Sequence, residues 1–102
     1  MWIGLACVKQ RTSSSVLGKD RAAYVNAIAL AHDDFDFCSQ IKLALKALDL
    51  EMVSLEEVET MVTRLSKYSI DEELRRIAAE VKRTGSPAFG TFHTFPEEDT
   101  SI

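Results

Sequence analysis

Two histidines and their neighbours are the side chains of this chain best suited to chemistry. His32 directly precedes Asp33, and His93 lies near the end of the last apolar segment. Imidazole and carboxylate groups can bind a divalent metal or form a general acid–base pair when a fold holds them close together. If His32 and His93 each follow a strand of a parallel sheet, both lie at its carboxyl edge, where ligands commonly bind. A site of His93, His32 and Asp33 would make the chain a small enzyme or a metal-binding protein.

The same residues also have structural explanations. Asp33 and Asp34 stand where a helix begins, and the carboxylate of either one can cap unpaired backbone amides. The amphipathic ring of His93, at the end of a strand, can close an apolar core. The sequence has no Gly-x-Ser-x-Gly elbow, no glycine-rich phosphate loop and no ligand spacing typical of zinc. The pattern therefore favours a non-enzymatic protein without metal or cofactor, and the His93 site remains the alternative.

Acidic side chains gather in the later part of the chain. Residues 1–31 carry four basic and one acidic residue, whereas residues 32–102 carry eight basic and fifteen acidic residues. No basic residue occurs between Lys46 and Arg64. An acidic segment of this kind steers a basic protein toward its surface, so we predict a protein-binding site there. Its residues are Asp49, Glu51, Glu56, Glu57 and Glu59.

The overall charge disfavours two other classes of partner. A net charge of −4 is unsuited to general binding of nucleic-acid phosphates or of an anionic membrane. No apolar run is long enough to span a membrane, and the apolar start lacks the basic residues and the length of a signal peptide. Cys7 and Cys38 are predicted to be buried, reduced thiols. We therefore expect a cytoplasmic protein with a basic protein partner.

Apolar periodicity predicts the elements that position these groups. Residues 22–31 are apolar on both alternating faces, which is typical of a strand covered on both sides. A helix follows, because apolar residues from Phe37 to Leu48 recur on one stripe. The later elements are a strand over 50–55, helical spacing over 58–65, and a helix that a Ser69–Glu72 capping box opens and Gly85 ends.

The two ends of the chain hold the remaining apolar segments. Residues 2–8 resemble a strand and are followed by a polar stretch. They form either the hairpin partner of the next strand or a loosely attached leader. The segment Phe89–Phe95, closed by Pro96, holds three phenylalanines. It predicts a buried central strand with His93 near its exit.

The order of these elements predicts the fold. Strands that alternate with helices imply right-handed crossovers and mainly parallel pairing. We therefore predict an α/β (or α+β) fold with a three- to four-stranded mixed, mainly parallel sheet, packed by two to three helices. The 102 residues form a single domain, with a strand-like leader and mobile loop over 1–21, a compact core over 22–96 and an acidic flexible tail over 97–102. An exposed sheet edge would also allow self-association as a homodimer.

Three short motifs carry a resemblance to known proteins. They are YVNAI at 24–28, LEEV at 55–58 and FGTFHTFP at 89–96. Over this span the chain resembles a small bacterial α/β family to which no defined role is attached. In size, acidity and architecture it is also similar to immunity proteins that neutralise bacterial toxins. The second resemblance implies an acidic immunity-type protein that occludes a basic toxin or enzyme, and it transfers no site residues.

Overall fold

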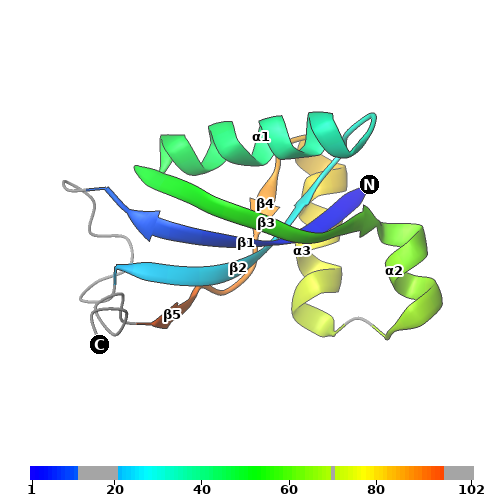
Figure 1. Ribbon diagram of the computed structural model, residues 1–102. Helices are drawn as coiled ribbons and strands as arrows, with labels where there is room; N and C mark the ends of the chain where they lie inside the picture. Colours follow the sequence, from blue (N-terminus) through cyan, green and yellow to red (C-terminus); the bar gives the residue numbers. More distant parts are fainter. Residues whose placement is uncertain (12–20, 70, 96–102) are drawn as a thin grey trace.

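A computed structural model of the chain describes residues 1–11, 21–69 and 71–95 (Figure 1). Within these ranges the chain forms five strands and three helices. In chain order they are β1 (Trp2–Gln10), β2 (Ala22–Ala29), α1 (Asp34–Ala47), β3 (Leu50–Thr60), α2 (Met61–Lys67), α3 (Glu72–Thr84), β4 (Ala88–Phe89) and β5 (His93–Phe95).

The strands form one sheet in which the neighbouring strands pair antiparallel. Its order is β3-β1-β2-β4, and β5 also pairs with β2. The predicted α+β class is therefore confirmed, whereas the predicted mainly parallel pairing is wrong. β2 and β3 do run in the same direction, as expected for strands joined by a helix. However, β1 lies between them and runs the opposite way, so each contact is antiparallel.

β1 is a central strand of the sheet and not a loose leader. It pairs with β2 on one side and with β3 on the other, which confirms the hairpin alternative for residues 2–8. Ile3 and Val8 are fully buried, so the strand contributes to the core on both faces. The predicted leader is therefore wrong for residues 2–10, which belong to the core, whereas the predicted mobile loop falls on residues 12–20, outside the described residues. The predicted tail over 97–102 lies outside the described residues.

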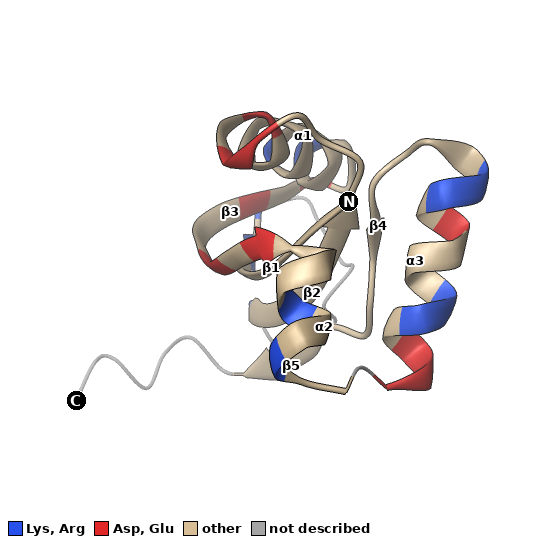
Figure 2. Cartoon of the chain, turned by 90° about the vertical axis from the view of Figure 1, so that its right-hand side faces the viewer, with Lys and Arg blue, Asp and Glu red and all other residues tan. Residues whose placement is uncertain are grey.

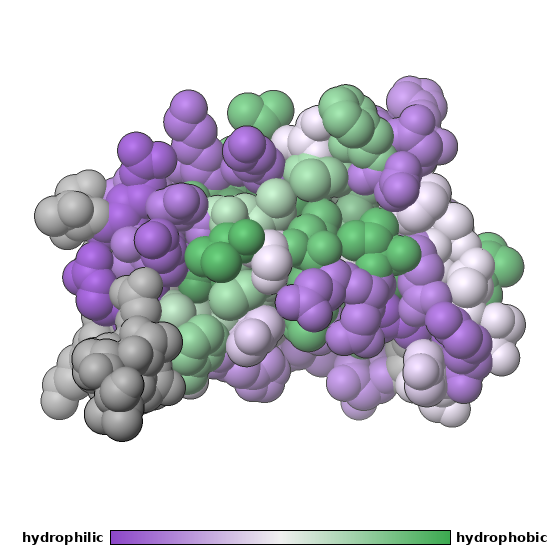
Figure 3. Space-filling view, in the orientation of Figure 1, coloured by the Kyte–Doolittle hydropathy of each residue, from purple (hydrophilic) through white to green (hydrophobic). Residues whose placement is uncertain are grey.

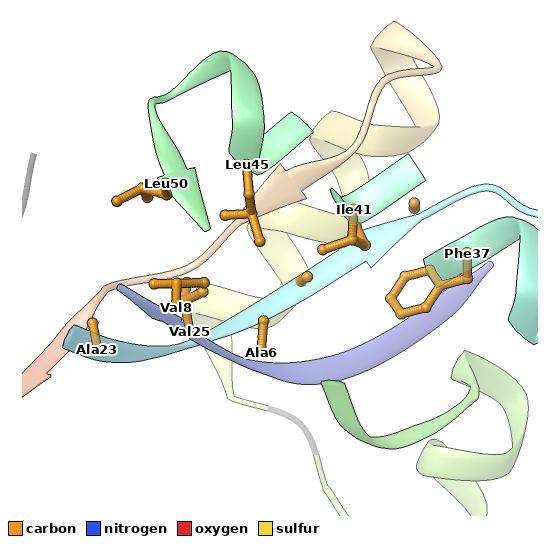
Figure 4. Packing of buried hydrophobic residues seen from close by; sticks show 10 residues of the cluster. Ala6, Val8, Ala23, Val25, Phe37, Ile41, Leu45 and Leu50 are labelled. Atoms are coloured by element: carbon orange, nitrogen blue, oxygen red, sulfur yellow. The ribbon is translucent and has the colours of Figure 1, made fainter. Parts of the chain in front are cut away.

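α1 covers one face of the sheet (Figures 1 and 4). It begins as predicted, because Oδ1 of Asp33 accepts a hydrogen bond from the backbone N–H of Asp36 at 2.8 Å. The predicted apolar stripe is also confirmed for Phe37, Ile41 and Leu45, which lie fully buried against the strands, whereas Leu48 at its end is exposed. The members of this cluster include Phe37, Ile41, Leu45, Ala6, Val8, Val25 and Leu50.

α3 covers only one end of the opposite face. It lies alongside β4, apart from α1 (Figure 2). The helix begins at Asp71 and not at the predicted Ser69, because the side chain of Asp71 accepts from the backbone N–H of Leu74 at 2.9 Å. It ends at Gly85 as predicted, with the left-handed φ of 77° that glycine adopts without strain. Its buried residues Leu74, Ile77 and Val81 form a second cluster with Ile3, Ile28 and Met61.

The segment Phe89–Phe95 is not the central strand that its aromatic residues predict. It forms two short strands, β4 and β5, which both pair with β2. Phe92 is half-buried at the margin of the α1 cluster. Phe95 stacks on Tyr24 with ring centroids 5.3 Å apart. Because β1 and β2 occupy the middle of the sheet, these rings cover the border of the core instead of filling it.

The two cysteines lie on different elements, Cys7 on β1 and Cys38 on α1, and both are free thiols. Each is half-buried, whereas full burial was predicted. Among the helices that the structure describes, none has the length and apolar character needed to cross a bilayer.

Candidate protein-binding surface

The structure does not bring His93, His32 and Asp33 together. His93 lies opposite Tyr24, near the start of β2, because β5 runs antiparallel to that strand. His32 and Asp33 follow the other end of β2, after Ala29. The strand between Tyr24 and Ala29 alone extends roughly 16 Å, at about 3.3 Å per residue. His93 is therefore too far from His32 and Asp33 to share a metal or a proton with them, and the hypothesis of a joint site fails.

Each of these residues has a local setting instead. Asp33 caps α1, and the backbone N–H of His32 donates to Oδ2 of Asp36 at 2.9 Å. The side chains of His32 and His93 are both exposed. In the described part of the chain, no group of three His, Cys, Asp or Glu side chains is arranged to hold a metal ion.

Three of the five predicted binding residues are paired with basic side chains. The pairs are Asp49 with Arg11 (3.3 Å), Glu51 with Lys9 (4.0 Å), and Glu59 with both Lys67 (2.7 Å) and Arg64. The prediction of an uncompensated acidic segment is therefore wrong for these three. For Asp49 and Glu51 strand pairing is the reason, because β1 and the residue after it bring Lys9 and Arg11 against β3. The partners of Glu59 lie on α2, which directly follows β3.

Glu59 joins the end of β3 to α2, where acidic and basic residues lie close together (Figure 2). Hydrogen bonds from Lys67 and Arg64 hold the pKa of Glu59 below its ordinary value of 4.5. Nη2 of Arg64 also donates to the backbone carbonyl of Glu57 at 3.1 Å. Glu59 therefore stabilises the fold and is not available to a partner.

Replacing Glu59 with glutamine is expected to destabilise the fold at neutral pH and to have little effect in acid. A carboxylate whose pKa is lowered by folding stabilises the native state above its ordinary pKa, and this contribution is lost as the pH falls through the folded value. The free energies of unfolding of wild type and Glu59→Gln, measured in urea, should therefore differ at pH 7 and converge as the pH falls below the ordinary carboxylate pKa. Lys67→Met, which removes a partner of the same carboxylate, should show the same trend. An equal difference at both pH values would contradict this role.

Glu56 and Glu57 remain as an exposed acidic pair on β3. Neither has an ion pair with the described residues, and Oε2 of Glu56 accepts only from the Ser54 hydroxyl, at 3.3 Å. Glu57 has a φ of 53°, in the left-handed region that is uncommon for such a side chain. Its carbonyl is held by Arg64, as described above, which supports this conformation. Both carboxylates are thus exposed to solvent, and the hydrogen bond from Arg64 holds the backbone at Glu57.

Two bulges shape the strand that carries this pair. The register between β1 and β3 shifts once between Ile3 and Leu5 and once between Cys7 and Val8. The second shift leaves Val53 without a partner residue on β1, and Val53 is 57% exposed. Bulges of this kind re-aim side chains and are common at sheet edges and next to functional sites. Between the two bulges, residues 54–56 of β3 pair with β1 in a regular register.

An apolar groove lies between α1 and β3, on the face of the sheet toward which Leu55 points. Its volume is about 280 Å³, and Phe35, at its border, is 79% exposed. Figure 3 shows apolar side chains gathered between α1 and β3 on this side of the molecule, with hydrophilic side chains around them. An apolar centre with a charged rim is typical of protein interfaces. We call the groove, with Glu56 and Glu57, the β3 surface; the groove is lined by Asp34, Phe35, Cys38, Leu55 and Val58.

A second groove, of about 420 Å³, lies between α3 and the residues around β4. Each of its two carboxylates already has a partner within the protein. Oγ1 of Thr91 donates to Glu73 at 2.5 Å, which helps to hold the pKa of Glu73 below its ordinary range, and Glu80 pairs with Arg83. This groove therefore lacks the exposed acidic pair that marks the β3 surface.

The part of the sheet that α3 leaves uncovered carries a row of reactive side-chain types. Ser54, Cys7, Tyr24 and His93 are successive partners across β3, β1, β2 and β5, so their side chains share one face. No local pattern of residues predicts this row, because only the pairing of distant strands creates it. Burial, with a smaller contribution from Glu56, raises the pKa of the Cys7 thiol. A protonated thiol is a weak nucleophile, so the row does not support nucleophilic catalysis.

No protein-family model, curated protein or solved structure matches this chain. The resemblances to a small bacterial family and to immunity proteins therefore stay predictions, and the β3 surface is interpreted from its own geometry.

Proposed function

We propose that this chain is a non-enzymatic protein-binding module, and specifically an acidic immunity-type protein that neutralises a basic toxin or enzyme by occluding it. The observation that carries the proposal is that β3 both carries the exposed pair Glu56 and Glu57 and lines an apolar groove through Leu55 and Val58. Burial of the groove supplies a non-directional driving force. The carboxylates select a partner of opposite charge.

The two parts of this surface contribute differently to binding. An exposed ion pair contributes only about 0.2–1 kcal/mol, so Glu56 and Glu57 cannot supply most of the affinity. Aromatic residues that become buried at the centre of an interface commonly do. Phe35, largely exposed at the groove, is the side chain suited to that role. We therefore expect the acidic pair to govern the association rate and Phe35 to govern the dissociation rate.

Reversing the acidic pair is the experiment that tests this function. A protein captured from the source cell at low salt should bind the Glu56→Lys/Glu57→Lys variant with an association rate about tenfold lower than wild type, because steering by charge is lost. The matched control is Glu72→Lys/Glu80→Lys, which makes the same change of charge on exposed positions of α3. Surface plasmon resonance would measure both rates.

Two outcomes would count against the proposal. One is recovery of no protein partner at either low or moderate salt. The other is a captured partner whose association rate is lowered equally by the α3 control, because the effect would then reflect overall charge and not the β3 surface.

We also propose that the protein acts in the cytoplasm. The support is that Cys7 and Cys38 are both free and only half-buried. Such thiols stay reduced in a cytoplasmic environment and are prone to oxidation outside it.

A further inference from the structure

The two edges of the sheet are built differently. β4 and β5 have two and three residues, and α3 lies alongside β4. β3 has eleven residues and, among the described strands, pairs only with β1, so its outer edge is open. Short or covered edge strands are a common protection against unwanted strand pairing. The edge formed by β4 and β5 has such protection, whereas the edge formed by β3 has much less of it.

The charge along β3 decides which chain could pair with the open edge. Glu51, Glu56 and Glu57 are exposed on this strand, and of their three carboxylates only that of Glu51 forms an ion pair with a described residue, Lys9 at 4.0 Å. Pairing with a second copy would bring these carboxylates near their own counterparts, and like charges across two strands are destabilising. A segment with basic side chains would instead gain from the same positions. The edge therefore favours a basic partner over self-association.

The alternation of side chains along β3 defines the pattern that such a segment needs. Leu55 points toward α1 and lines the groove, whereas Ser54 and Glu56, on either side of it in sequence, point to the other face of the sheet. A strand laid beside this stretch presents its own alternate residues to the same two faces. Apolar residues would then enter the groove while the intervening basic residues approach Glu56.

We propose that the partner adds an extended segment, with alternating apolar and basic residues, to the outer edge of β3 as an additional strand. This inference rests on the proposed function and specifies how the β3 surface binds. Main-chain hydrogen bonds supply affinity in this mode, and pockets for alternate side chains supply specificity. The bulges at Val53 and Glu57 limit regular pairing to the short stretch 54–56, which also prevents open-ended sheet growth.

The experiment uses peptides selected against the whole chain. Random heptapeptides displayed on phage would be enriched on the immobilised protein, and the enriched sequences made synthetically. We expect alternating basic and apolar residues, and peptide-induced shifts of the backbone amide signals of 54–56. N-methylation should weaken binding about tenfold at alternate peptide positions and little at those between them, because only every second amide faces β3. The chain alone should elute as a monomer at two concentrations in size-exclusion chromatography.

Several results would overturn the inference. They are enrichment of no peptide, binding that is insensitive to N-methylation at every position, amide shifts confined to other elements, or a chain that dimerises on its own. The experiments distinguish a wrong mode of binding from a wrong function. If reversal of Glu56 and Glu57 weakens the natural partner but N-methylation has no effect on the peptides, the surface is correct and strand addition is wrong. If that reversal leaves the natural partner unaffected, the proposed function itself fails.

Discussion

Replacing Phe37 with alanine is expected to lower the free energy of unfolding by about 3–5 kcal/mol. Phe37 is fully buried between α1 and the sheet and is among the largest of the fully buried side chains. The loss combines the transfer energy of the ring with the cavity that it leaves. Because small domains are stable by only about 5–15 kcal/mol, the variant should be close to unfolding at room temperature. Urea denaturation followed by circular dichroism would measure the change.

Phe35 provides the matched control two positions earlier on the same helix. Its ring is 79% exposed, so Phe35→Ala should change stability by no more than about 0.5 kcal/mol. Equal destabilisation by the two substitutions would contradict the assignment of Phe37 to the core and Phe35 to the surface. Phe35→Ala should nevertheless weaken partner binding, which separates a residue used for folding from one used for recognition.

Replacing Gly4 with valine is expected to destabilise the protein by about 1–3 kcal/mol, because the site has no room for a side chain. A Cβ atom there would lie 3.0 Å from Cε2 of Phe37, 3.2 Å from Cγ2 of Val58 and 3.3 Å from Cδ1 of Leu55. Alanine adds only the Cβ atom, whereas valine also adds two methyl groups beyond it. Gly4→Ala should therefore have a smaller effect than Gly4→Val. Thermal or urea unfolding of both variants would test the order.

The Gly4 substitutions also connect the core with the proposed binding site. Leu55 and Val58 line the groove of the β3 surface, and added atoms at position 4 must displace them. A variant that remains folded should therefore bind the partner more weakly than wild type. Gly4→Val as stable as wild type would show that the sheet and α1 are packed less closely there than the structure indicates.

Local signals made several elements predictable from the sequence. The cap at Asp33 and the apolar stripe of α1 depend only on residues within a few turns of one helix. The end of α3 at Gly85 depends on a single residue that tolerates positive φ. The start of α3 was misplaced because Ser69 and Asp71 both have side chains suited to capping, and the structure uses the second.

The sheet could not be predicted in the same way, because its order depends on contacts between distant segments. A long polar stretch between β1 and β2 carries none of the two-residue turn patterns that identify a hairpin. Without that hairpin, alternating strands and helices indicate a parallel sheet. Insertion of β1 between β2 and β3 is a single change, yet it replaces the expected parallel contact between these two strands with two antiparallel contacts.

The candidate site was predicted only in part, because contacts between distant segments also decide which of its side chains stay exposed. Glu56 and Glu57 were identified from charge and stay exposed in the structure. Asp49 and Glu51 were identified with them, but Arg11 and Lys9 reach them only because β1 lies next to β3. The groove beside Leu55 was not predicted, since it forms between two elements whose contact no local pattern reveals.

The central position of β1 has a consequence for how the protein folds during synthesis. One side of this strand pairs with β2, but the other side pairs with residues that follow at least 40 positions later, from Gln10 with Leu50 to Trp2 with Thr60. Contacts of such wide sequence separation form slowly, because a long loop must close first. Until the ribosome has released β3, the nascent hairpin keeps an open, apolar flank. The period of greatest risk of aggregation therefore comes midway through translation.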